Sequence, residues 1–255
     1  MDSNMTFGLI CEGLTDQEVI WNILYGYTGD KRLAINPVQP RLDRTSRNKP
    51  NKNKGKEPTN YAGWGEVFNY CKSANMALAL KAYDFLIVEI DTDAAEQWKM
   101  GISLTEGGKD KDPDIIVSEV ADKILGLLDA EAFALRHKII FAIAIHSIEC
   151  WLLPLYANNG LDSTKNCLKR LNEAKPPTSV KKEKGVYDKL SKDYKTPKEL
   201  KKYYPLNPSF AIFIKNLDEK LNPKKKLRRL RRQELVKYWR KRPKLSSKKF
   251  PKKRQ

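Results

Sequence analysis

Short hydrophobic runs alternate with longer amphipathic segments along the first 150 residues or so of the chain. Residues 7–11, 85–90 and 138–145 are nearly continuous apolar runs, a pattern typical of strands buried on both faces of a parallel sheet. A weaker run at residues 35–38 is consistent with an edge strand. Strands that alternate with helices predict an α/β fold, with a parallel sheet flanked by helices.

Three segments have the periodicity of amphipathic helices. The first follows Gly13, where Thr15 and Glu18 have the spacing of a capping box that would start a helix. Residues 63–80 predict one continuous helix, and residues 115–128 predict another.

The apolar stretch Ile139–Tyr156 is long enough to suggest a membrane span, but it contains Glu149. A central glutamate costs roughly 2.5–3.5 kcal/mol on insertion scales, so a strand followed by a buried turn or short helix is the better interpretation. The N-terminus lacks the basic and apolar regions of a signal peptide. We therefore expect a cytoplasmic protein with no membrane partner.

Charge is distributed very unevenly between the two parts of the chain. Residues 165–255 contain 32 Lys and Arg against 8 Asp and Glu, whereas residues 1–164 contain 17 against 23. This asymmetry predicts an α/β catalytic domain at 1–164 and a basic, mostly helical region at 165–255 that binds a polyanion. Nucleic acid is the favoured polyanion, and an anionic membrane surface is the alternative.

The four cysteines and two histidines do not have the spacing of a metal site. Cys11, Cys71, Cys150 and Cys167 form no C-x-x-C pair, and three of them lie in apolar stretches. Buried reduced thiols are common in such stretches, so we expect neither a disulfide framework nor a zinc site.

Acidic residues follow each of the three central strands. Glu12 and Asp16 follow the first strand, Asp91 and Asp93 the second, and Glu149 the third. Carboxyl ends of parallel strands meet at one edge of a sheet, where α/β proteins bind their ligands. A cluster of oxygen ligands favours Mg²⁺ or Mn²⁺. Two alternatives remain open: Asp16 only complements the helix dipole, and Glu12 is a solvated strand end.

The sequence E-G-L-T-D at residues 12–16, with a later strand that ends in D-T-D at 91–93, resembles the Toprim domain. This domain occurs in topoisomerases, bacterial primases and the overcoming-lysogenization-defect nucleases. The segments HSIECWLLP and NPSFAIFIKNL are similar to those of small Toprim-like proteins associated with phage defence. The resemblance covers roughly residues 5–155, with 207–217 as a weaker similarity.

The resemblance implies a role for each acid. Glu12 takes the general acid/base or metal-ligand role, while Asp91 and Asp93 bind Mg²⁺. Asp16 matches an acid that holds a second metal in the nuclease branch, and Glu149 matches a late acid of the small-protein group. The chain departs from the family at residues 94–95, where Ala-Ala stands in place of the usual glycine.

The C-terminal tail, residues 224–255, combines a dense positive charge with interleaved aromatic residues, which fits phosphate contacts plus base stacking. A solvated charge run and a membrane-bound amphipathic helix are the alternatives. The Lys/Asn/Pro-rich loop at 41–60 is either an unstructured insertion or a second polyanion contact. The residues of the tail expected to bind nucleic acid are Lys224, Lys225, Lys226, Arg228, Arg229, Arg231, Arg232, Trp239 and Arg240.

These patterns favour a Mg²⁺- or Mn²⁺-dependent nuclease that hydrolyses DNA or RNA, including tRNA, in phage defence. The family resemblance further suggests a regulatory partner such as an ATPase. A non-catalytic nucleic-acid or ribonucleoprotein binding module on a degenerate Toprim scaffold is the alternative function.

Overall fold

The computed structural model describes residues 5–30, 32–41, 63–93, 95–96, 100–158, 165–174, 176–178, 180–181 and 183–222. The chain divides into two compact units, Met1–Asn216 and Leu217–Gln255. Residues 165–216 therefore belong to the same unit as the sheet, whereas most of the second unit lies outside the described ranges.

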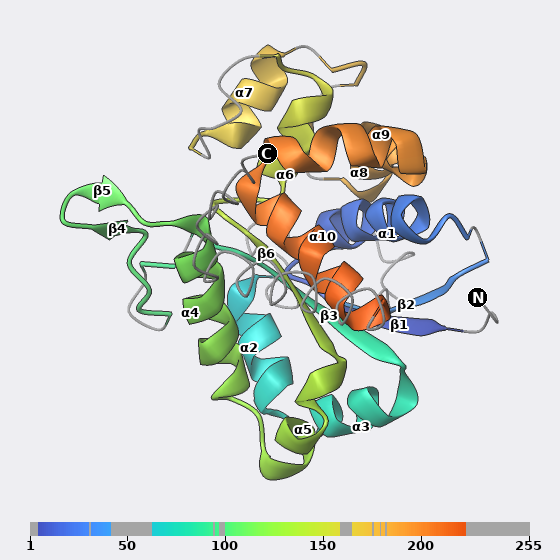
Figure 1. The fold of residues 1–255 in the computed structure, drawn as a ribbon, viewed down its shortest axis with the longest axis vertical. Coiled ribbons are helices and arrows are strands. Elements are labelled where there is room, and N and C mark those ends of the chain that lie inside the picture. The colour runs from blue at the N-terminus through green and yellow to red at the C-terminus, as the bar shows by residue number, and fades with distance from the viewer. Residues whose placement is uncertain are drawn as a thin grey trace, which may run out of the picture. The chain divides into compact units, whose positions relative to one another are not determined.

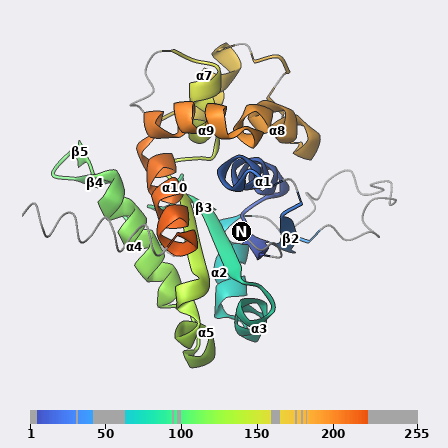
Figure 2. The ribbon, with the colours of Figure 1, turned by 45° about the vertical axis from the view of Figure 1, so that its right-hand side comes forward.

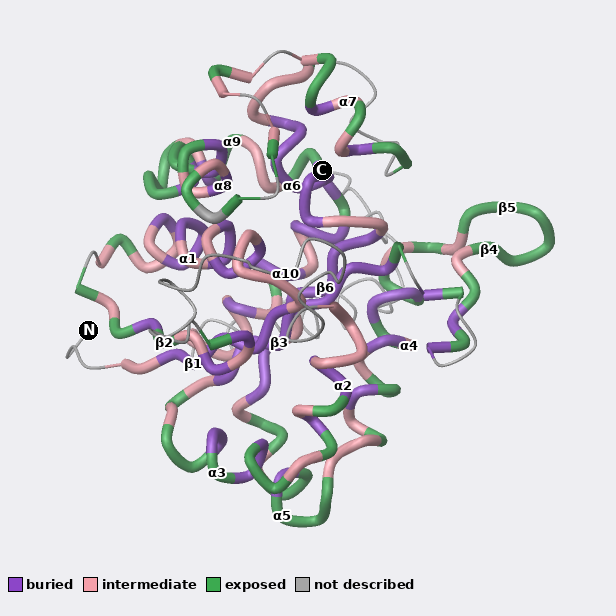
Figure 3. The backbone as a smooth tube through the Cα atoms, turned by 180° about the vertical axis from the view of Figure 1, so that it is seen from behind, coloured by how far each residue is buried: buried purple, intermediate pink, exposed green. Residues whose placement is uncertain are grey.

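A four-stranded parallel sheet forms the centre of the first unit (Figure 1). Its strands are β1 (Thr6–Ile10), β2 (Ala34–Gln39), β3 (Phe85–Asp91) and β6 (Ile139–Ala144), in the order β2-β1-β3-β6. This confirms that the three central apolar runs are parallel neighbours, and that the weaker run at 35–38 forms an edge strand. The strands β1, β3 and β6 are almost wholly buried (Figure 3).

Helices cover both faces of the sheet (Figure 2). One face packs against α2 (Trp64–Lys72), α3 (Ala74–Ala82), α4 (Pro113–Leu125) and α5 (Ala130–Ala134) through a core of aliphatic side chains. On the other face lies α1 (Leu14–Thr28), which packs in turn against α8 (Lys184–Ser191), the 3-10 turn η4 (Lys192–Lys195) and α9 (Pro197–Tyr203).

The remaining elements are short, apart from the last helix. They are the hairpin β4 (Thr105–Glu106) and β5 (Lys109–Asp110), the 3-10 turns η2 (Arg136–Lys138), η3 (Leu153–Leu155) and η5 (Tyr204–Leu206), and the helices α6 (Glu149–Leu152), α7 (Cys167–Glu173) and α10 (Pro208–Leu221). The apolar stretch 139–156 is thus a strand followed by a short helix, as predicted. No helix in the described ranges is both long and apolar enough to cross a bilayer.

The structure corrects two local predictions about helices. The predicted helix at 63–80 is broken at Ser73, whose backbone is extended and whose hydroxyl donates 2.8 Å to the carbonyl of Tyr70. Serine side chains compete with helical hydrogen bonds in this way. The predicted capping box is also wrong, because α1 begins at Leu14 with Gly13 as N-cap, and Thr15 donates instead to Asp16 Oδ1.

The expectation that no disulfide forms is wrong as well. Cys150 on α6 is bonded to Cys167 on α7, although 17 residues separate them. Cys11 and Cys71 are buried free thiols, as expected. The pairing depends on the contact between the two short helices, which the spacing of cysteines along the sequence does not reveal.

Candidate active site at the carboxyl edge of the sheet

The candidate site is formed where the three central strands end. Glu12 lies two residues beyond the end of β1, Asp91 is the last residue of β3, and Glu149 begins α6 after β6. The backbone N–H of Asp91 donates a hydrogen bond of 2.8 Å to Glu12 Oε1. Because an aspartate carboxylate stays within about 5 Å of its own backbone nitrogen, the two carboxylates lie within about 8 Å of each other.

Glu89 is a further acid at this edge to which the sequence assigned no role. It lies two residues before Asp91 on β3, so both side chains point to the sheet face covered by α1. Glu89 is fully buried, and its Oε2 accepts a hydrogen bond of 3.2 Å from the backbone N–H of Glu12. Ala142 and Ala144, which pair with these two acids on β6, have small side chains that leave room for the carboxylates.

Asp91 and Asp93 have different surroundings, although the resemblance implies that both bind Mg²⁺. The strand β3 ends at Asp91, which is only 9% exposed, whereas Asp93 lies in an exposed turn. The backbone leaves the sheet at Thr92, whose hydroxyl accepts a hydrogen bond of 2.8 Å from the N–H of His146. Asp93 nevertheless stays close enough to raise the pKa of Glu12 by its charge.

Asp16 lies in the first turn of α1 and is 6% exposed. Its charge raises the pKa values of Glu12, Glu89 and Asp91, which places it among them. A Cβ at Gly13 would approach Asp16 Oδ2 to 3.0 Å, so the glycine allows the carboxylate to lie close to the backbone. Asp16 therefore does more than complement the helix dipole.

Glu149 is buried and accepts a hydrogen bond at Oε1 from the hydroxyl of Tyr187, a fully buried residue on α8. Burial, followed by the charge of Glu149, raises the pKa of Tyr187, so the hydroxyl keeps its proton and acts as the donor. No sequence motif marked this tyrosine, because its partner is 38 residues away.

The segment around Glu149 is held in place by residues of the motif at 207–217. Ser209 Oγ accepts hydrogen bonds from Trp151 Nε1 at 2.9 Å and from the N–H of Ile145 at 3.3 Å. Asn207 Nδ2 donates 3.2 Å to the carbonyl of Cys150. The two segments that carried the resemblance to small Toprim-like proteins are thus packed together in the structure.

His146 lies two residues beyond the end of β6, in the left-handed region with a φ of 63°. This conformation is uncommon for a residue other than glycine and often occurs near functional sites. Burial and the charge of Lys165 lower the pKa of its half-buried imidazole, so the ring is neutral at pH 7.

The electrostatics of the cluster are dominated by burial and by repulsion between neighbouring acids. Burial is the main cause that raises the pKa of Glu12 to about 8, and the hydrogen bond from Asp91 opposes it. Burial and then the neighbouring acids raise the pKa values of Glu89 and Asp91 well above their usual range. In the described part of the chain, no ion pair involves Glu12, Glu89, Asp91 or Glu149.

The carboxylate oxygens of the site are the atoms that would bind a divalent cation. Within the described ranges, no group of three or more His, Cys, Asp or Glu side chains is arranged to hold a metal ion as it stands. However, Glu89 Oε1 and Asp91 Oδ1 are buried and accept no hydrogen bond from the described part of the chain, although the two carboxyl groups lie close enough to share a proton. Buried polar atoms are rarely left unpaired, and an unseen ion is one explanation. The all-carboxylate donor set suits Mg²⁺ or Mn²⁺.

The residues predicted to bind nucleic acid lie outside the part of the chain that the structure describes. Residues 224–255 of the tail and residues 42–62 of the Lys/Asn/Pro-rich loop lie outside the described ranges. Their assignment as polyanion contacts stays a prediction from charge and composition.

No family model, curated protein or solved structure was found to match this chain.

Proposed function

We propose that this chain is a nuclease dependent on Mg²⁺ or Mn²⁺, with its active site at the carboxyl edge of the sheet. The observation that supports this most is the pair of buried, unpartnered oxygens, Glu89 Oε1 and Asp91 Oδ1, beside three further acids. Acids in this density repel one another unless protons or a cation neutralise them. A divalent cation next to a phosphodiester is a common arrangement for its hydrolysis.

In this proposal Asp91, Asp16, Glu149 and Asp93 hold the cation, and the unpartnered Oε1 of Glu89 faces the same charge. When bound there, Mg²⁺ or Mn²⁺ supplies positive charge that polarises a phosphoryl oxygen and makes a bound water more acidic. Asp91, Asp16 and Glu149 are the buried members of the set, and Asp93 approaches it from the exposed turn.

Glu12 is proposed to act as the general acid that protonates the leaving oxygen. Its Oε1 accepts a hydrogen bond from the N–H of Asp91, and burial raises the pKa of this carboxyl group to about 8 in the metal-free protein, so it holds a proton at neutral pH. When water attacks phosphorus and the bond to the leaving oxygen breaks, Glu12 donates its proton to the leaving oxygen. The attacking water releases one of its protons to solvent, and Glu12 is then reprotonated from solvent. Glu89 accepts from the N–H of Glu12 and so acts as a positioning residue.

Nucleic acid is the proposed substrate because the chain joins this acidic site to a strongly basic region. The 17 Lys and Arg of residues 224–255, against a single acid, would bind phosphates and release counterions. The role in phage defence and the ATPase partner remain proposals that rest on the resemblance to Toprim-like proteins.

A non-catalytic nucleic-acid binding module is the second candidate. Two observations favour it: the described acids form no ready metal-ligand group, and Asp93 is exposed in a turn rather than aligned with Asp91. In that case Glu12, Glu89 and Asp91, whose pKa values are raised, would keep their protons, and the protein would bind nucleic acid without cleaving it.

One experiment separates the two functions. Purified full-length protein is incubated with mixed DNA and RNA in Mn²⁺ or in EDTA, next to Glu12→Gln and the exposed control Glu106→Gln. The nuclease proposal expects cleavage by the unmodified chain and by Glu106→Gln in Mn²⁺ only, and none by Glu12→Gln. Salt-sensitive binding of nucleic acid with no cleavage in Mn²⁺ would favour the binding module.

A further inference from the structure

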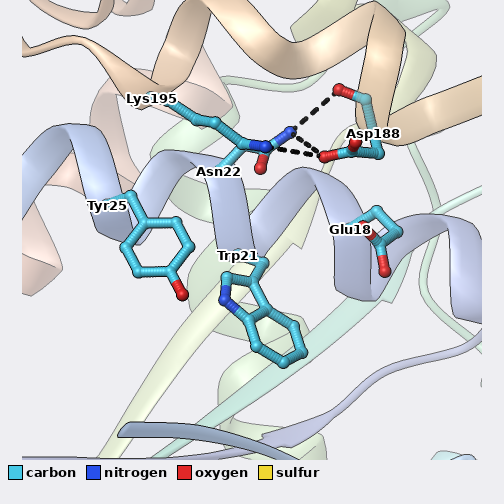
Figure 4. A pocket seen from close by; sticks show the side chains of 6 residues that line it. All are labelled: Glu18, Trp21, Asn22, Tyr25, Asp188 and Lys195. Carbon is cyan, nitrogen blue, oxygen red and sulfur yellow. Dashed lines mark hydrogen bonds and ion pairs between the residues drawn. The ribbon is translucent and has the colours of Figure 1, made fainter. Parts of the chain in front are cut away.

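A pocket of about 170 Å³ opens on α1, next to the segment formed by α8 and η4. It is separate from the carboxylate cluster, because its side chains come from the later turns of α1 and from residues beyond 187. Figure 4 shows the side chains that line it. They are Glu18, Trp21, Asn22, Tyr25, Asp188 and Lys195.

The polar side of the pocket is tightly hydrogen-bonded. Asn22 is only 1% exposed, and its Nδ2 donates to Ser191 Oγ at 2.7 Å, to the carbonyl of Asp188 at 3.1 Å and to Asp188 Oδ1 at 3.3 Å. The ammonium of Lys195 lies 2.9 Å from the same Asp188 oxygen. This network holds Asp188 and Lys195 in fixed positions against α1.

The aromatic side is formed by Trp21 and Tyr25, which are half-buried and four residues apart. Residues at this spacing are neighbours on a helix surface. Figure 4 shows both rings projecting from α1 on the same side as Glu18, while Asn22 points toward Asp188. Two adjacent ring faces are therefore available beside carboxylate oxygens and an ammonium group.

This combination identifies the chemical class of the ligand. Aromatic faces bind flat rings by stacking. Carboxylates accept hydrogen bonds from ring amino groups, as Asp and Glu do from cytosine N4. A phosphate is disfavoured, because the lining contains two acids and only one base, which is already paired with Asp188. A planar, uncharged heterocycle with amino substituents fits best.

We propose that this pocket binds a base of a single-stranded nucleic acid, with Trp21 and Tyr25 as the stacking surface. The inference rests on the proposed function and specifies its substrate as single-stranded. Trp21 and Tyr25 follow Asp16 by five and nine residues on the same helix. They therefore lie roughly 8 and 14 Å along its axis from the candidate active site. The bound base is therefore within a few nucleotides of the cleaved bond.

The test measures binding rather than cleavage. Full-length Glu12→Gln protein, which keeps the pocket, is titrated in EDTA over a salt series with a single-stranded oligoadenylate of about 12 nucleotides. Both DNA and RNA forms are used, with an abasic strand of equal length as the ligand control. The variants are Trp21→Ala, Tyr25→Ala and Trp21→Phe, and the matched control is Phe133→Ala. Phe133 is an exposed aromatic on α5, just before β6 and so at the opposite end of the strands.

The proposal expects Trp21→Ala and Tyr25→Ala to weaken oligoadenylate binding by between about 5-fold and about 150-fold. The salt dependence should not change, since no phosphate contact is removed. Affinity for the abasic strand should stay the same, Trp21→Phe should keep most of the binding, and Phe133→Ala should match the parent protein.

Equal weakening for the abasic strand, or no weakening at all, would overturn the proposal while leaving the nuclease function intact. If Trp21→Ala instead abolishes binding of an arginine-rich peptide and spares the oligonucleotide, the pocket is a cation–π site for a protein partner. Conversely, Trp21-dependent base binding by a protein that never cleaves would refute the nuclease and support the pocket.

Discussion

The backbone N–H of Asp91 donates a hydrogen bond of 2.8 Å to Glu12 Oε1, which joins the ends of two neighbouring strands across 79 residues of sequence. This bond fixes the position of the Glu12 carboxyl group beside Asp91. Because a glutamine Oε1 can accept the same bond, Glu12→Gln should fold normally.

We predict that Glu12→Gln keeps full nucleic-acid binding but loses turnover, since an amide cannot donate the proton. A loss of 10²-fold or more in rate is expected for removal of a general acid. Cleavage of a labelled oligonucleotide in Mn²⁺ and melting of the protein provide the two measurements. Retained cleavage would exclude Glu12 as the proton donor.

Asp91 and Asp93 should differ in their effect on stability although both are needed for cleavage. Asp91→Asn removes one of several repelling buried acids, so the metal-free protein should gain about 1 kcal/mol or more in free energy of unfolding. Asp93→Asn changes an exposed turn residue and should shift stability by less than about 0.5 kcal/mol.

Urea unfolding of both aspartate variants in EDTA, paired with cleavage assays in Mn²⁺, tests this prediction. The exposed control Glu106→Gln should alter neither quantity. If both aspartate variants cleave as well as the parent protein, the proposed mechanism is wrong.

Stability of the metal-free protein should depend on pH with a definite sign. In the unfolded chain Glu12 loses its proton near its ordinary pKa of 4.5, whereas in the folded protein it does so at about 8. The folded state therefore binds the proton more tightly, and stability falls as pH rises between these two values. The raised pKa values of Glu89 and Asp91 act in the same direction.

Thermal melting in EDTA at about pH 5.5 and about pH 8 measures this trend, and Glu12→Gln should show a smaller fall. Added Mn²⁺ should raise the melting temperature more at the higher pH, because protonated carboxyl groups do not bind cations. An equal effect of Mn²⁺ at both pH values would argue against binding by these acids.

Tyr187 should stabilise the site through its hydrogen bond to Glu149. Tyr187→Phe leaves a buried carboxylate oxygen without its donor, at a cost of about 1–3 kcal/mol. The double variant with Glu149→Leu should recover part of this loss, since neither partner then remains unpaired. A double-mutant cycle by urea unfolding gives the coupling, and purely additive losses would show that the bond contributes little.

Deletion of residues 224–255 should separate nucleic-acid binding from metal binding. The deletion removes 17 basic residues and one acid, so affinity for nucleic acid should fall much less steeply with salt. Binding of Mn²⁺ should stay the same, because the carboxylates lie in the first unit. Unchanged affinity and salt dependence after the deletion would assign the tail to a protein partner, a membrane or solubility.

Much of the central sheet could be predicted because buried parallel strands need continuous apolar runs. Residues 7–11, 85–90 and 138–145 correspond to β1, β3 and β6 within one or two residues. The position of Glu12, Asp91 and Glu149 at one edge of the sheet could also be predicted, because parallel strands end on the same side.

Other features depend on contacts between residues far apart in sequence, which local patterns do not record. The segment 181–202 is rich in lysine and has few apolar residues, yet Tyr187, Leu190, Tyr194 and Leu200 are buried in it. The disulfide and the donor to Glu149 likewise arise only when α6 meets α7 and α8.

The sequence by itself determined which strands form and which acidic residues lie at their ends, because buried strands need continuous apolar runs and the acidic residues directly follow these runs. Only the tertiary structure decided how those acids differ in burial and in pKa. Register and the end of β3 bury Glu89 and Asp91 but leave Asp93 exposed. The pKa of a carboxyl group depends on burial and on neighbouring charges in space. Glu12 therefore acquires its pKa of about 8 only when the chain folds around it.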